Sequence, residues 1–164
     1  MTTLGDVVGL DLVEEFASWD FSEIQKVLQV LQLEQAIDLA HAELLQQKSL
    51  RGADLAAEYL AKIVKSVSYL ESKLNVVKNK ASLEYSPKDV SKVTADMRKQ
   101  YGESSPETEL WAEKLARARG AKSVLEKKFD LLIKSHYYYK ELAMGFKKSI
   151  PTEAGRGIEK SGWE

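Results

Sequence analysis

Lysine and tyrosine are the residues whose types and spacing in this sequence suggest a chemical role. Between residues 59 and 83 there are five lysines and a single acid, Glu71, a local excess of four positive charges. Ammonium groups neutralise phosphates and tyrosine rings stack on unpaired bases, so the pattern predicts contact with single-stranded DNA without sequence preference. The candidate binding residues are Lys62, Lys65, Lys73, Lys78, Lys80, Tyr85, Lys88 and Lys92.

Charge is divided unevenly along the chain. Residues 1–58 carry 3 Lys/Arg and 11 Asp/Glu, a balance of −8, whereas residues 59–164 carry 21 and 14, a balance of +7. This asymmetry indicates a basic binding face, or acidic and basic surfaces that meet between subunits. A third interpretation is that both are ordinary solvated helix faces, which contribute little to stability or binding.

Catalytic chemistry is not indicated by any motif. The sequence has no Walker A loop, no dinucleotide-binding glycine pattern and no His-Glu-x-x-His zinc motif. Cysteine is absent, and the two histidines, His41 and His136, are expected on different helices. We therefore expect no enzymatic activity, no metal and no cofactor.

Two heptad patterns must position the basic residues. Apolar side chains recur every three or four residues in two long stretches, the spacing of a left-handed coiled-coil seam. Lys122 and His136 interrupt the second seam, where a polar residue sets register or oligomer number, or marks exposure to water. The first seam is Ala53, Ala56, Leu60, Ile63, Val67, Leu70, Leu74, Val77 and Ala81, and the second is Trp111, Leu115, Ala118, Lys122, Leu125, Phe129, Leu132, His136, Tyr139, Ala143 and Phe146.

The seams predict an all-α protein built on a long helical hairpin over residues 51–148, either alone or as the unit of a homo-oligomer. The expected long helices are 54–84, capped by Asp54 after a break at Gly52, and 106–144, opened by Ser105-Pro106 and ended by Gly145. A short connecting helix is expected to begin at Ser86-Pro87, to present Val90, Val93, Met97 and Tyr101 on one face, and to end at Gly102.

An acidic helical segment is expected over residues 1–50, ahead of the hairpin. It would contain a short helix at 6–16 and a longer one at 22–48, the latter opened by a Ser22/Gln25 capping box with Phe21 as a hydrophobic staple. Residues 149–164 lack periodicity and are expected to form a flexible tail. The N-terminus has no basic region and no apolar run approaches the roughly 20 residues of a membrane span, so we expect a cytoplasmic protein without a membrane partner.

Residues 78–86, Lys-Asn-Lys-Ala-Ser-Leu-Glu-Tyr-Ser, close a long helix with a basic pair and an acid-tyrosine-serine step. A lysine-bearing connector and a long helix with a tyrosine-rich end follow. This order resembles the recombination mediator proteins of the UvsY type found in tailed phages, and the likeness covers about residues 55–148. Pro87 stands where that family has a glycine.

The resemblance implies a protein without enzymatic activity that binds single-stranded DNA in the host cell cytoplasm. Such a protein would form a ring-like homo-oligomer and help a recombinase displace the single-strand-binding protein. The DNA-contacting basic residues of the family correspond best to Lys80, and next to Lys78.

A structural role is the alternative. A helical component of a phage head, neck or tail would show the same seams and the same lack of catalytic motifs. Its acidic and basic surfaces would then meet between neighbouring subunits.

Overall fold

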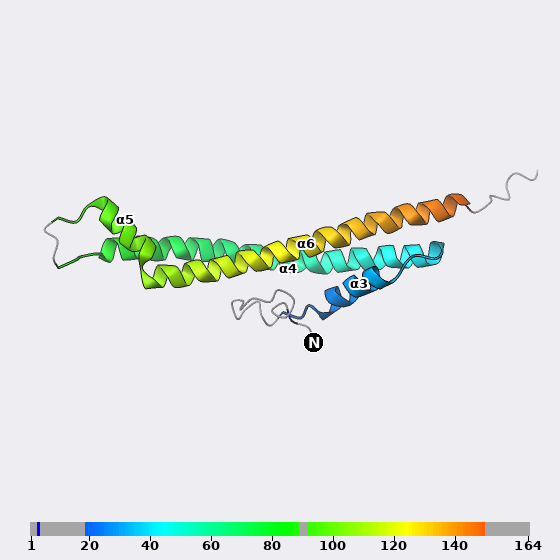
Figure 1. Cartoon of the computed structure of the whole chain (residues 1–164), viewed down its shortest axis with the longest axis horizontal. Helices are drawn as coiled ribbons and strands as arrows, with labels where there is room; N and C mark the ends of the chain where they lie inside the picture. Colours follow the sequence, from blue (N-terminus) through cyan, green and yellow to red (C-terminus); the bar gives the residue numbers. More distant parts are fainter. Residues whose placement is uncertain (1–2, 4–18, 89–91, 150–164) are drawn as a thin grey trace, which may run out of the picture.

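The computed structural model describes residues 3, 19–88 and 92–149, and within these it is an all-α hairpin. Helix α4 (Leu39–Glu84) and helix α6 (Pro106–Ser149) lie side by side along the long axis of the molecule (Figure 1). Helix α5 (Ala95–Ser104) lies at the connector end, and helix α3 (Ser22–Leu33) packs beside the other half of the hairpin. The predicted hairpin with a connecting helix and an N-terminal helical element is confirmed.

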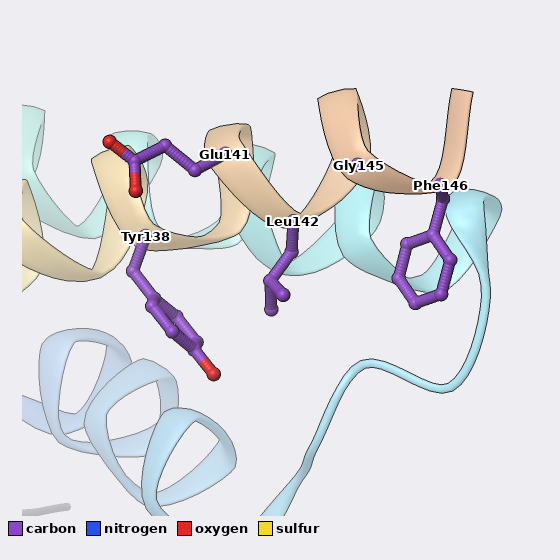
Figure 2. A pocket seen from close by; sticks show the side chains of 5 residues that line it. All are labelled: Tyr138, Glu141, Leu142, Gly145 and Phe146. Carbon is purple, nitrogen blue, oxygen red and sulfur yellow. The ribbon is translucent and has the colours of Figure 1, made fainter. Parts of the chain in front are cut away.

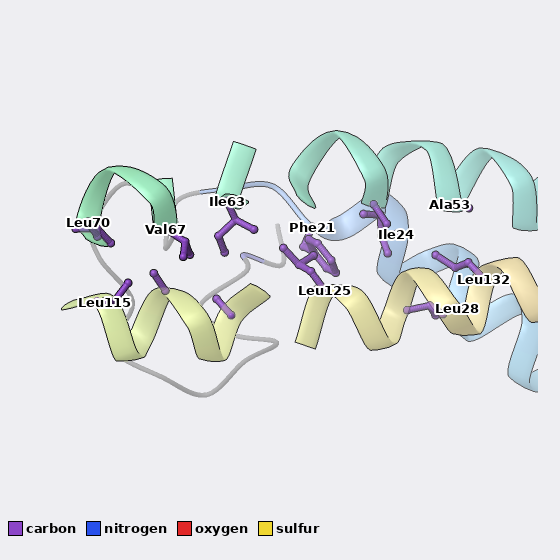
Figure 3. Close-up of a cluster of buried hydrophobic side chains, with 13 residues drawn as sticks. Phe21, Ile24, Leu28, Ala53, Ile63, Val67, Leu70, Leu115, Leu125 and Leu132 are labelled. Atoms are coloured by element: carbon purple, nitrogen blue, oxygen red, sulfur yellow. The ribbon is translucent and has the colours of Figure 1, made fainter. Parts of the chain in front are cut away.

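Both predicted seams form the contact between α4 and α6. Every seam residue is buried or half-buried, and Ile63, Leu125 and Leu132 are fully buried. Each large apolar side chain removed from water in this way contributes about 1.5–3 kcal/mol. Figure 3 shows that Phe21, Ile24 and Leu28 add a third set of apolar side chains to this core.

The predicted break at Gly52 is wrong, because α4 continues through this position. A Cβ atom at Gly52 would lie 3.0 Å from side-chain atoms of both Leu132 and Val27, so the glycine allows α3 and α6 to approach α4 closely. A glycine inside a helix costs about 1 kcal/mol relative to alanine, and the packing around it offsets that cost. Asp54 is therefore an interior residue of α4 and not a cap.

The actual break lies between α3 and α4. The helix expected over 22–48 ends at Leu33, and α4 begins at Leu39, so the expected division of the chain after residue 50 falls inside α4. Asp38 caps α4 by accepting a hydrogen bond from the backbone N–H of His41 at 2.7 Å. An aspartate N-cap satisfies a helix donor that would otherwise lack a partner.

The start of α3 also differs from the prediction. Ser22 is the first helical residue and makes no capping box; its backbone N–H donates instead to Oδ1 of Asp20 at 2.9 Å. This hydrogen bond is the main cause of a pKa of Asp20 below its ordinary value. Phe21 is fully buried, with its ring centroid 5.8 Å from that of Tyr59, whose hydroxyl donates to the Asp20 carbonyl at 2.7 Å.

Helix α5 is shorter at its start than predicted. It is capped by Thr94 and not by Ser86, and Val90 lies outside the described residues. Gly102 does not end the helix: it is buried inside it, where a Cβ atom would lie 2.6 Å from the Lys78 carbonyl oxygen. Glycine is thus needed where the α5 backbone meets α4.

Helix α6 begins as predicted and ends later. Ser105 caps it, accepting a hydrogen bond from the Thr108 backbone N–H at 3.3 Å. The helix passes through Gly145 and ends at Ser149. The helix expected at 6–16 lies outside the described residues, and so does the tail expected over 149–164 apart from Ser149, which is the last residue of α6. None of the helices in the described residues is both long and apolar enough to cross a membrane.

Candidate nucleic-acid interface

Four of the candidate lysines share one face of α4. At about 100° per residue, positions eleven and eighteen residues apart return to within about 20° of each other, so Lys62, Lys73 and Lys80 are aligned and Lys65 lies beside them. The four span α4 from its middle to its connector end. We call this set the lysine face.

Tyr69 lies on the lysine face, one helical turn from Lys65 and one turn from Lys73. Its side chain is 62% exposed, although tyrosine usually buries most of its ring. Within the described residues its ring has no aromatic partner and its hydroxyl has no hydrogen bond. The structure therefore presents an exposed ring between two ammonium groups.

Trp111 extends the lysine face onto α6. The Lys73 Nζ atom lies 5.8 Å from the centroid of the Trp111 ring, and the Lys114 Nζ atom lies 4.9 Å from it. Both distances are within the range of cation–π attraction. Sequence reasoning missed Lys114 because only the register between α4 and α6 brings it to Lys73.

Lys62 is held by aromatic rings at the opposite end of the face. Its Nζ atom lies 5.4 Å from the Tyr59 ring centroid and 6.0 Å from the Trp19 ring centroid. The Trp19 and Tyr59 rings are themselves stacked, with centroids 5.2 Å apart. This end of the lysine face is consequently fixed by the segment that leads into α3.

The single acid within the basic stretch does not weaken the lysine face. Glu71 lies about 180° from Lys62 around α4, on the opposite side of the helix. Its Oε1 atom accepts from Arg119 of α6 at 2.7 Å. Glu84 lies closer to the face, 3.9 Å from Lys80, but an exposed pair of this kind contributes only about 0.3–0.5 kcal/mol.

Lys78 and Tyr85 do not lie on the lysine face. Lys78 lies about 160° from Lys62 around the helix and is half-buried where α5 crosses α4. The Tyr85 ring stacks on Tyr101 of α5 with centroids 4.6 Å apart, so it holds the connector in place. Lys88 and Lys92 are exposed on the two sides of the connector segment that lies outside the described residues.

The histidines and the polar seam residues have structural partners. The His136 Nδ1 atom lies 3.3 Å from the carbonyl oxygen of Gln46, and His41 Nε2 lies 3.2 Å from Glu34. Lys122 pairs with Glu126 at 3.4 Å at an edge of the seam open to water. Among the described residues, no group of three or more His, Asp or Glu side chains is placed to hold a metal ion.

Comparisons of this chain with protein-family models, with curated proteins and with solved structures gave no match. The arguments for a function therefore come from the lysine face itself.

Proposed function

We propose that this protein is a non-enzymatic binder of single-stranded DNA and acts as a phage-type recombination mediator that helps to load a recombinase. The observation that carries the proposal is the exposed Tyr69 ring between Lys65 and Lys73 on a face with two more lysines. The resemblance to the UvsY-type mediators supplies the recombinase and the single-strand-binding protein as expected partners, and the host cytoplasm as the expected place of action.

The geometry favours single strands over duplex DNA. Unpaired bases expose their flat faces, and stacking on an aromatic side chain contributes about 1–3 kcal/mol per base. In a duplex the bases are stacked on each other, so the Tyr69 ring would have no base to contact. Duplex binding would use the ammonium groups alone.

The salt dependence of binding tests this proposal. Under this proposal, phosphates are contacted by five ammonium groups, those of Lys62, Lys65, Lys73, Lys80 and Lys114. At about −0.7 per single-strand phosphate, the log–log slope of affinity against salt should approach about −3.5. Fluorescence anisotropy with a labelled oligonucleotide measures the slope.

A matched pair of variants locates the interface. Replacing Lys65 and Lys73 with alanine should weaken binding and reduce the slope by about 1.4, because two phosphate contacts are lost. Replacing Lys127 and Lys134, two exposed lysines on α6, removes the same charge elsewhere and should change the slope little. An affinity that does not respond to salt, or equal losses in both variants, would contradict the proposal.

A structural role in a phage particle is the second candidate, and the separation of charge along the hairpin favours it. The acidic side chains of residues 19–58 outnumber the basic ones, whereas the lysine face lies on the other half of α4. Neighbouring subunits would then pair these two regions. In that case the Lys65 and Lys73 variant would lose assembly in native mass measurements, and the wild-type protein would not bind DNA.

A further inference from the structure

A polar cavity lies at the connector end of the lysine face. Its volume is about 310 Å³, and it is lined by the end of α4, by Tyr101 of α5 and by the first turn of α6. It differs from the hollow in Figure 2, where Tyr138, Leu142 and Phe146 point to the same side of a single helix. Lys80 is the last residue of the lysine face and also lines the polar cavity, so a strand bound along the face would reach it.

The walls of the polar cavity are held in place before any ligand binds. The Tyr101 ring stacks on Tyr85 with centroids 4.6 Å apart. The buried Ser105 hydroxyl donates to the Thr108 hydroxyl oxygen at 2.8 Å, and the Thr108 hydroxyl donates to the Gly102 carbonyl oxygen at 2.7 Å. A preformed site loses little conformational entropy on binding, and small-molecule sites begin at volumes of about 300 Å³. The cavity is therefore suited to one small ring system.

The charges that line the polar cavity favour a neutral occupant. One ammonium group, that of Lys80, and two carboxylates, those of Glu84 and Glu107, give a local balance of −1. The carboxylates repel a phosphate, and the ammonium group repels a second cation. Tyr101, which is 43% exposed, adds an aromatic wall. A neutral planar group with both hydrogen-bond donors and acceptors, such as an unpaired nucleobase, satisfies these conditions.

The polar groups of the cavity are available for such contacts. Glu107 is exposed in the first turn of α6, and its side chain makes no ion pair or hydrogen bond within the described residues. The Lys80 Nζ atom lies 3.9 Å from Glu84, at the outer limit of an ion pair, and its side chain is 63% exposed. The Tyr101 hydroxyl also has no hydrogen bond to any described residue. A base entering the cavity would therefore disturb one weak contact at most.

We propose that the polar cavity selects guanine as one unpaired base of a bound single strand, an inference that rests on the proposed function. Guanine has two adjacent donors, N1–H and N2–H, from which the Glu107 carboxylate accepts, and its O6 and N7 atoms accept from Lys80. Lys80 has three N–H donors, so it contacts a phosphate as well. Thymine, cytosine and adenine each lack the adjacent pair of donors. Binding along the rest of the lysine face stays independent of sequence.

Base substitution in the strand tests the preference. Oligothymidylates as long as the lysine face, with one guanine at the 5′ end, at the 3′ end or in the middle, are compared with the unsubstituted strand by fluorescence anisotropy. A terminal guanine that reaches the cavity should raise the affinity roughly fivefold. A central guanine should not, because placing it in the cavity would move half of the strand off the lysine face. Inosine, which lacks the 2-amino group, should lose most of the gain at the terminal position.

A matched pair of variants tests the role of Glu107. Glu107→Gln replaces one acceptor oxygen with a donor and should abolish the guanine preference. Glu109→Gln removes the same charge from the same turn of α6 but lies outside the cavity, so it should keep the preference. Because each variant loses one negative charge, both should change the affinity for oligothymidylate by the same small factor.

The outcomes separate this inference from the proposed function. If the wild type bound guanine-bearing and unsubstituted strands equally, or if the preference survived Glu107→Gln, the guanine site would be overturned and single-strand binding would stand. If no strand bound at all, both proposals would be overturned.

Discussion

The two halves of the hairpin use the same seam but differ in what covers it. In the half next to α3, Phe21, Ile24 and Leu28 pack over the seam and form a three-helix core with α4 and α6. In the connector half, the seam between α4 and α6 is bordered directly by the lysine face and Trp111. The difference shows that α3 deepens the core in its half, whereas in the connector half α5 packs on α4 near Gly102 and leaves Lys65 and Tyr69 exposed.

Basic side chains also differ between the halves. Near α3 they join helices: Arg51 pairs with Glu23 at 2.6 Å, and Lys147 pairs with Glu43 at 2.7 Å. On the lysine face, Lys65 has no ion pair among the described residues, and Lys62 and Lys73 lie over aromatic rings. Arg119 joins α6 to α4 through Glu71 in the connector half as well, so the contrast is confined to the lysine face, whose lysines make no ion pair to another helix among the described residues.

The largest expected effect tests the difference in burial. Leu132→Ala should destabilise the protein by about 4 kcal/mol and Leu115→Ala by about 2.5 kcal/mol, because the cavity at Leu132 is enclosed by three helices and cannot collapse as easily. Urea unfolding of both variants measures the two free energies. Equal losses would show that α3 adds little to the core.

Much of the fold could be predicted from the sequence, because heptad spacing alone identified both seams and the hairpin. The break at Gly52 was wrong because local propensity does not report the contact with Leu132 and Val27 that offsets the cost of glycine. Helix periodicity could have separated Lys78 from Lys80, which lie about 200° apart around α4. The sequence could not show that Lys73 and Lys114 both lie near the Trp111 ring, because this depends on the register between α4 and α6, which are distant in sequence.

An intermediate effect concerns the exposed tyrosines of the two halves. Tyr69→Ala should weaken binding of single-stranded DNA by about 1–3 kcal/mol, whereas Tyr69→Phe should keep most of the affinity because the stacking ring remains. Tyr137→Ala is the matched control, since Tyr137 is 58% exposed but lies in the other half. If anisotropy titrations showed equal losses of affinity for the two alanine variants, an exposed tyrosine in either half would contribute equally, and the lysine face would not be the specific site of base stacking.

The smallest expected effect concerns the attachment of α3. The pKa of Asp20 is lowered in the folded state by the hydrogen bond from Ser22, so ionised Asp20 stabilises the fold above its ordinary pKa of 3.8. This contribution is lost as the pH falls through the lower folded pKa. Asp20→Asn should therefore be slightly less stable than the wild type at neutral pH and equally stable in strong acid.

Thermal melts across this pH range measure the difference. Asp54→Asn, a change at an exposed position of α4, is the control. Its stability difference from the wild type should not disappear in strong acid. If the stability difference between Asp20→Asn and the wild type stayed constant with pH, the ionisation of Asp20 would not contribute to holding α3 in place.

Because α4 is one continuous helix, the distance between the first and last lysines of the lysine face sets the length of strand that would be needed to contact all of them. Lys62 and Lys80 are eighteen residues apart, which corresponds to about 27 Å along a straight helix. At about 3.4 Å per nucleotide, a stacked strand of about eight nucleotides would cover that distance, and a stretched strand would need fewer. Oligonucleotides trimmed below this footprint should lose affinity in steps, one lysine at a time.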